Sequence, residues 1–142
     1  WRVCTWLPYS GHPAACAVAL KNIELIKKEN ILDSVKNSIA PYLRDKWLSL
    51  GDHPIVGEAR IKGLMGAIEL SNDKEKRSRF PSDFNSGSLC RDISIKNGLV
   101  MRAVGDSMII APPLVINHQQ IDELVDKARI TLDQTREAVQ KL

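Results

Sequence analysis

Residues 98–116 read GLVMRAVGDSMIIAPPLVI. Two apolar runs of β-type residues, 99–101 and 107–110, flank the pair Gly105-Asp106. A pair of this kind between two such runs is typical of a hairpin turn. Because Pro112 and Pro113 cannot donate a backbone hydrogen bond, the chain must leave the sheet there. The stretch therefore predicts two strands joined by a tight turn.

Arg102 is the charged residue at the end of the first run. A guanidinium on a strand end, aimed by the turn, can hold a carboxylate or a phosphate through two parallel hydrogen bonds. The competing interpretation is a solvated arginine, or one paired with a local acid such as Asp106, since most exposed charges bind no ligand. From the residues alone, Arg102 is the one candidate anion site.

Helical periodicity precedes this stretch. It predicts a helix over 14–28, with Ser10 or His12 in the cap region and Pro13 in the first turn. A second helical pattern covers 31–47, where Pro41 would kink the helix or remove one hydrogen bond.

Two further helices bracket the hairpin. A short helix is predicted over 88–97, with Leu89 and Ile93 facing inward and Cys90 as a third inward candidate. Asn117 should cap a final helix over 118–141. The apolar positions of that helix form one stripe: Ile121, Leu124, Val125, Ala128, Leu132 and Val139.

Strand patterns fill the middle of the chain. Residues 55–56 and 64–70 are rich in β-type residues, and the polar segment 71–88 is predicted as a flexible loop. The order of helices and strands predicts an α+β fold. We expect a three- to four-stranded, mostly antiparallel sheet with helices on one side.

Composition narrows the function classes. The chain has 142 residues, the size of one ordinary domain, with 20 basic and 17 acidic residues well mixed along it. The one basic run, 74–79, is interrupted by Glu75, which favours a solvated loop over a nucleic-acid surface. No apolar run approaches the ~20 residues of a membrane span. The start lacks Met and any signal-peptide pattern, so we expect a segment of something longer.

The sequence contains no Gly-rich phosphate loop and none of the motifs Gly-x-Ser-x-Gly, His-Glu-x-x-His and Cys-x-x-Cys. Three cysteines, Cys4, Cys16 and Cys90, lie far apart, which argues against a disulfide framework or a zinc site and indicates a cytoplasmic protein. The three histidines, His12, His53 and His118, are scattered beside turns, and we expect structural roles for them. Cys90 with a remote histidine makes no usable dyad.

Several segments together resemble the class III aminotransferases, fold-type I enzymes that use pyridoxal 5'-phosphate (PLP), with the ω-amino acid:pyruvate group closest. They are Tyr9-Ser10-Gly11-His12-Pro13 with the helix after it, Arg60 with residues 63–70, residues 97–102, and residues 109–114. The segments occur in the family's order and at natural spacing.

The resemblance implies the C-terminal part of such an enzyme, acting between an amine or ω-amino acid and a keto acid such as pyruvate. Residues 1–13 would be a loop leading in from a missing N-terminal large domain, 14–30 an interdomain helix, and 31–142 the small C-terminal domain. The family's Schiff-base lysine lies upstream of this chain, so the chain alone should not transaminate. A homodimer is implied for the complete enzyme.

Two site roles carry over by resemblance. Arg102 matches the family arginine that binds the substrate carboxylate. Pro8 and Tyr9 match the loop that reaches the cofactor phosphate of the neighbouring subunit, where the family has Thr in place of Pro8. Ile61 replaces the glycine that usually follows the arginine corresponding to Arg60. The resemblance implies no catalytic lysine in this chain and no metal.

Two alternatives stay open beside an aminotransferase fragment. One is a non-enzymatic α+β binding or dimerisation module that presents Trp1, Trp6 and a small-residue helix face to a partner chain. The other is a regulatory domain that senses a carboxylate ligand through Arg102.

Overall fold

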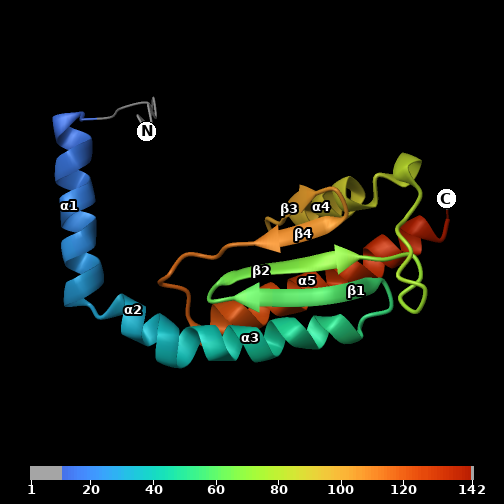
Figure 1. Ribbon diagram of the computed structural model, residues 1–142, viewed down its shortest axis with the longest axis horizontal. Helices are drawn as coiled ribbons and strands as arrows, with labels where there is room; N and C mark the ends of the chain where they lie inside the picture. Colours follow the sequence, from blue (N-terminus) through green and yellow to red (C-terminus); the bar gives the residue numbers. More distant parts are fainter. Residues whose placement is uncertain (1–10, 142) are drawn as a thin grey trace, which may run out of the picture.

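The computed structural model describes residues 11–141 (Figure 1). A four-stranded antiparallel sheet in the order β1-β2-β4-β3 forms one layer, and α3, α4 and α5 cover one of its faces. This confirms the predicted α+β sheet with helices on one side. The elements in chain order are α1 (Pro13–Lys28), α2 (Ile31–Ser34), a π-helical turn (Val35–Ile39), α3 (Ala40–Leu48), a 3-10 turn (Ser49–Asp52), β1 (Val56–Lys62), β2 (Met65–Leu70), a 3-10 turn (Ser82–Phe84), α4 (Ser86–Lys96), β3 (Arg102–Val104), β4 (Ser107–Ile110) and α5 (His118–Val139).

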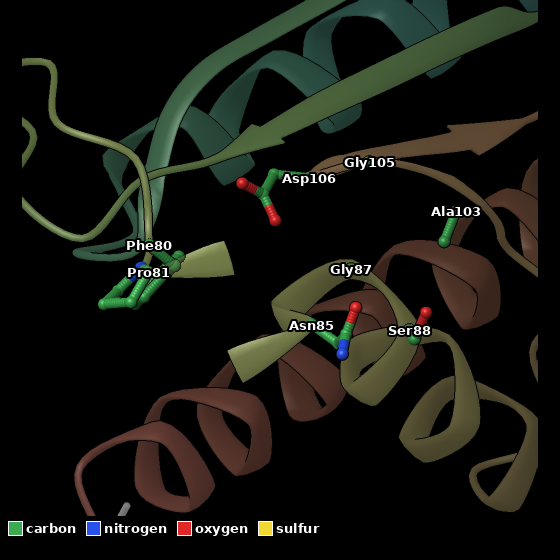
Figure 2. A pocket seen from close by; sticks show the side chains of 8 residues that line it. All are labelled: Phe80, Pro81, Asn85, Gly87, Ser88, Ala103, Gly105 and Asp106. Atoms are coloured by element: carbon green, nitrogen blue, oxygen red, sulfur yellow. The ribbon is translucent and has the colours of Figure 1, made fainter. Parts of the chain in front are cut away.

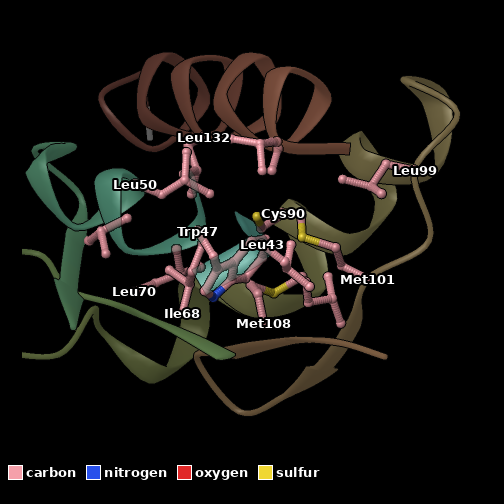
Figure 3. Close-up of a cluster of buried hydrophobic side chains, with 14 of the residues drawn as sticks. Leu43, Trp47, Leu50, Ile68, Leu70, Cys90, Leu99, Met101, Met108 and Leu132 are labelled. Atoms are coloured by element: carbon pink, nitrogen blue, oxygen red, sulfur yellow. The ribbon is translucent and has the colours of Figure 1, made fainter. Parts of the chain in front are cut away.

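The core lies between the sheet and the helices (Figure 3). Alternation along β2 turns Ile68 and Leu70 toward the helices, where both are buried, while Met65 on the other face is exposed. Trp47 of α3 is fully buried over Gly66, where an added Cβ would lie only 2.9 Å from the indole Nε1. Glycine at position 66 therefore lets the largest core side chain lie against the sheet.

Helix α5 begins as its sequence predicts. The Asn117 side chain accepts a hydrogen bond from the Gln120 backbone N–H at 2.9 Å, and the Gln120 side chain accepts one from the Asn117 N–H at 3.0 Å. Its buried stripe also includes Thr131 and Thr135, which the apolar pattern missed. Thr135 is compatible with burial because its hydroxyl donates to the Thr131 carbonyl at 2.7 Å.

The second helical segment is irregular just before Pro41, the residue for which the sequence predicted a kink or the loss of one hydrogen bond. The π-helical turn Val35–Ile39 ends there, and Pro41 then occupies the first turn of α3. A proline lacks the N–H of a regular helix and its ring crowds the carbonyl four residues back. The wider π turn accommodates that crowding without breaking the helix.

Two local predictions were wrong and a third was only partly right. Residues 99–101 are not a strand: β3 starts at Arg102, opposite Ile109, because its partner β4 ends at Ile110, just before the two prolines. On α4 the third inward candidate, Cys90, is buried as predicted, whereas Leu89 and Ile93, expected to face inward most, are only half-buried. The segment 71–88 is not a plain loop, since an Asp73–Ser78 bridge closes a turn within it and α4 already begins at Ser86.

Helix α1 stands apart from the body (Figure 1). Its first residue is Pro13 and His12 occupies the N-cap position, while Ser10 lies outside the described residues. None of its residues is buried. Even the apolar side chains of Val18 and Leu20 leave 69% and 70% of their surface exposed. In the part of the chain that the structure describes, every helix is too short or too polar to cross a lipid bilayer.

Candidate functional site

The sheet face opposite the helices carries a row of four side chains. Strand register places Arg60 opposite Ala67, Ala67 opposite Ile109, and Ile109 opposite Arg102. Neighbouring strands lie about 4.8 Å apart, so the backbones of the two arginines are separated by roughly 14 Å. The row therefore has an arginine at each end and an apolar floor between them.

Arg60 is committed to acidic neighbours. Its guanidinium nitrogens lie 3.5 Å from Glu58 Oε2 and 3.5 Å from Glu69 Oε2. Those two carboxylates face each other across β1 and β2, which would be unfavourable without a cation between them. The Ser107 hydroxyl also donates to Glu69. This arrangement keeps the Arg60 charge occupied within the sheet surface.

Arg102 differs from Arg60 in its surroundings. Within residues 11–141 its exposed guanidinium makes no hydrogen bond or ion pair. The predicted local acid, Asp106, instead accepts a hydrogen bond from the Ser86 hydroxyl. Val100 and Val104, two residues before and two residues after Arg102, lie on the same face of its segment and are 82% and 52% exposed. A guanidinium in an apolar surround attracts an anion more strongly once that surface is covered.

Local structure fixes the backbone on either side of Arg102. Met101, just before it, is 1% exposed and points into the core, as does half-buried Ala103 after it, which pairs with Met108. The predicted turn at Gly105-Asp106 is confirmed, with Gly105 at φ +56°. A positive φ suits glycine because it has no Cβ to clash. Arg102 is thus held outward by inward-facing neighbours.

Other predicted residues lie apart from this face. Pro8 and Tyr9 fall outside the described residues. His53 is buried, accepts the Ile55 N–H at Nδ1 and therefore donates from Nε2 to Asp133 Oδ1 at 3.1 Å. Among residues 11–141, no three His, Cys, Asp or Glu side chains come together as a possible metal site. Burial raises the pKa of the Cys90 thiol, which suits a core residue.

A polar cluster joins α3 to the start of α5. The Tyr42 hydroxyl lies 2.8 and 2.9 Å from the two Asp122 oxygens, and Lys46 Nζ lies 2.8 Å from Asp122. The His118 ring packs edge-on against Tyr42 at 4.5 Å between centroids, and its Nε2 lies 3.3 Å from the Ser38 hydroxyl. The hydrogen bond from Lys46, then that from Tyr42, lowers the pKa of Asp122. The cluster ties two helices together and lies away from Arg102.

Sequence reasoning singled out Arg102 but missed its setting. Val100, Arg102 and Val104 stand at every second position of the sequence, which is the spacing of residues on one face of a strand. The pairing of Arg60 with Glu69 was not visible, because those residues lie on different strands and meet only through register.

Comparisons with known proteins agree on one family. The family model described as aminotransferase class-III matches residues 7–132. A putrescine–pyruvate aminotransferase of Pseudomonas aeruginosa is 56% identical over 92% of this chain and 28% of its own length. A mitochondrial gamma-aminobutyrate transaminase of Solanum lycopersicum is 37% identical over 94% of this chain and 26% of its own.

Solved structures give the same result for the fold. A thermostable omega transaminase from Pseudomonas jessenii superposes with a TM-score of 0.85 at 31% identity, over 96% of this chain and 30% of that one. An omega-transaminase from Thermomicrobium roseum gives 0.84 at 32% identity, over 95% of this chain and 30% of that one. The chain thus spans less than a third of the length of the proteins it matches.

Proposed function

Because this chain belongs to the class III aminotransferase family, we propose that it works as part of an enzyme that transfers an amino group. The donor would be an amine or ω-amino acid and the acceptor a keto acid such as pyruvate. The names of two relatives, a putrescine–pyruvate aminotransferase and a gamma-aminobutyrate transaminase, support both substrate classes.

This proposal rests on the absence of an acidic partner for Arg102 among the described residues. The other arginine of its row, Arg60, already faces Glu58 and Glu69, whereas Arg102 has no acidic partner in the described part of the chain. We assign Arg102 to the substrate carboxylate, which its planar guanidinium can bind through two parallel hydrogen bonds. Val100, Val104 and Ile109 would exclude water around that ion pair and so strengthen it.

PLP would supply the electron sink that amino-group transfer requires. The described residues alone do not fit this cofactor. The side chains next to Arg102 on its face are Val100, Val104 and Ile109, and none of them can form an imine, bind a phosphate or pair with a pyridine nitrogen. We therefore assign cofactor binding to the large domain and, through Pro8 and Tyr9, to the loop that reaches a neighbouring subunit.

Helix α1 supports the proposed domain boundaries. A helix that is apolar over most of its circumference is normally buried, yet none of the α1 residues is buried here. We propose that residues 1–13 lead in from the large domain, that 14–30 form the interdomain helix, and that 31–142 form the small domain. We also propose that the complete enzyme is a cytoplasmic homodimer.

A chimeric enzyme tests the proposal. The aligned segment of the Pseudomonas aeruginosa enzyme is replaced by this chain, and amino transfer is measured with pyruvate and with an aldehyde that lacks a carboxylate. Hydrogen bonds to a charged group contribute about 1.5–3 kcal/mol, so Arg102→Ala should raise the KM for pyruvate roughly 10- to 100-fold. The aldehyde kinetics should not change.

Arg60→Ala is the matched control, because it removes an arginine from the same row that is already occupied by acids. We expect its KM for pyruvate to stay within about threefold of the wild-type value, since exposed ion pairs contribute little. An unchanged KM in the Arg102→Ala enzyme would refute the assignment of Arg102.

The second candidate function is a non-enzymatic dimerisation module, which the unburied apolar side chains of α1 favour. Light scattering on the 142-residue chain, together with activity of the chimera, separates the two. A stable dimer with an inactive chimera would support the module. An active chimera whose pyruvate KM depends on Arg102 would support the enzyme.

A further inference from the structure

We infer that Ser86 and Asp106 are positioning residues for Arg102, holding the hairpin on which it lies at the angle that carboxylate binding requires. Neither residue would touch the substrate. The inference rests on the proposed function of Arg102, but its evidence is a separate set of contacts between α4 and the β3–β4 turn.

The hairpin needs outside support. β3 contains three residues, lies at the edge of the sheet and pairs only with β4. So short an edge strand has few ladder hydrogen bonds to fix its direction. Arg102 is its first residue, and the turn at Gly105-Asp106 closes its other end. A shift of the turn would therefore be transmitted to Arg102.

Asp106 is attached to two other elements. Its carboxylate accepts the hydroxyl of Ser86, the first residue of α4, which is fully buried. Its backbone carbonyl accepts the Leu70 N–H at 2.9 Å, at the end of β2. Both donors, the Ser86 hydroxyl and the Leu70 N–H, belong to buried residues, so leaving either of them unpaired is costly and the two bonds define one geometry.

The backbones of α4 and the turn also touch directly. Figure 2 shows Asp106 and Gly105 of the turn facing Gly87 of α4. A Cβ built on Gly87 would lie 1.9 Å from the Gly105 carbonyl oxygen, so only glycine permits this approach. With Ser86 beside it, Gly87 presses the start of α4 against the turn.

A pocket lies beside the contact between α4 and the β3–β4 turn, and it gives the turn space into which it could move. It has a volume of about 360 Å³, and its lining includes Phe80, Asn85, Ala103 and Asp106 (Figure 2). Close packing normally prevents a turn from shifting, but this turn borders open space. Without the Ser86–Asp106 hydrogen bond, the hairpin could move into that space. Displacing a binding group by about 1 Å is enough to weaken its function substantially.

Amide hydrogen exchange on the 142-residue chain tests the attachment. Ser86→Ala and Asp106→Ala should each speed exchange in residues 102–110 at least tenfold and leave α5 unchanged. Asp106→Asn is the matched control, since its Oδ1 can still accept the Ser86 hydroxyl, and we expect wild-type exchange. Equal rates in the hairpin would overturn the inference, as would acceleration of hairpin and α5 together, which would indicate a general loss of stability.

Kinetics of the chimeric enzyme test the positioning role. Ser86→Ala and Asp106→Ala should raise the KM for pyruvate about tenfold, with kcat and the aldehyde KM unchanged, and Asp106→Asn should restore the wild-type value. If Arg102→Ala raises the pyruvate KM but these two variants do not, the positioning inference fails and the proposed function stands. If Arg102→Ala has no effect, the proposed function fails, and this inference fails with it.

Discussion

Replacing Gly87 by alanine should destabilise the domain, although alanine is the better helix former. Gly87 is the second residue of α4, where alanine would gain about 1 kcal/mol of intrinsic helix propensity. The new Cβ would meet the Gly105 carbonyl oxygen at 1.9 Å. Because that oxygen belongs to the backbone, no side-chain rotation can relieve the overlap.

The size of the effect follows from that overlap. Real Cβ atoms essentially never come closer than 3.0 Å to another heavy atom, so α4 and the turn must separate by about 1.1 Å. Overpacking of this kind typically costs about 1–3 kcal/mol, and a backbone contact belongs at the upper end. After the gain in helix propensity we expect a net loss of about 2 kcal/mol in the free energy of unfolding.

Urea unfolding followed by circular dichroism measures this loss. Gly51→Ala is the matched control, because the nearest atom to its Cβ would be Ala59 Cβ at an ordinary 3.7 Å. We expect that control to stay within about 0.5 kcal/mol of the wild type. A Gly87→Ala chain as stable as the wild type would refute the close approach of α4 to the turn.

Three further outcomes are expected. Iodoacetamide should label exposed Cys16 in the folded chain, and Cys90, which is buried and has a raised thiol pKa, should react only after unfolding; mass spectrometry of the labelled peptides would contradict this if both react equally. Asp122 has a lowered pKa, so its contribution to stability is present above the ordinary aspartate value of about 3.9 and is lost as pH falls through its folded-state value. Tyr42→Phe should therefore reduce the dependence of stability on pH in that acid range, and an identical acid titration of stability would show that the hydrogen bond contributes nothing. Asn117→Ala should cost about 1 kcal/mol of stability, whereas Asn117→Asp should retain the cap, and equal urea midpoints for the two variants would contradict the capping role.

Features that depend on a few adjacent residues could be predicted from the sequence. The turn at Gly105-Asp106 follows from glycine's tolerance of a positive φ, and the start of α5 follows from the side-chain chemistry of Asn117 and Gln120. A local irregularity at Pro41 was likewise predictable from its missing N–H, although its form, a π-helical turn over Val35–Ile39, was not. Arg102 could be chosen as the candidate anion site because it is an isolated charge in an apolar stretch.

The boundary of β3 could not be predicted in this way. The residues 99–101 have strand propensity, but their partner strand β4 ends at Ile110, so the ladder begins only at Arg102. Similarly, the inward face of α4 is set by what it packs against, so Cys90 is buried and Leu89 is not. Intrinsic preference gives way when tertiary contacts favour another arrangement.

Short-range features follow from the sequence alone. They are the turn at Gly105-Asp106, the N-cap of α5, the every-second-residue spacing of Val100 and Arg102, and the family motifs. The difference between Arg60 and Arg102, the two arginines of the row, depends on the folded sheet. Arg60 meets Glu58 on its own strand, and the register of β1 against β2 also brings it Glu69. Within residues 11–141 the sheet brings no acidic side chain to Arg102. Register between strands depends on the burial of whole faces and on the connections between them, which no local window of sequence contains.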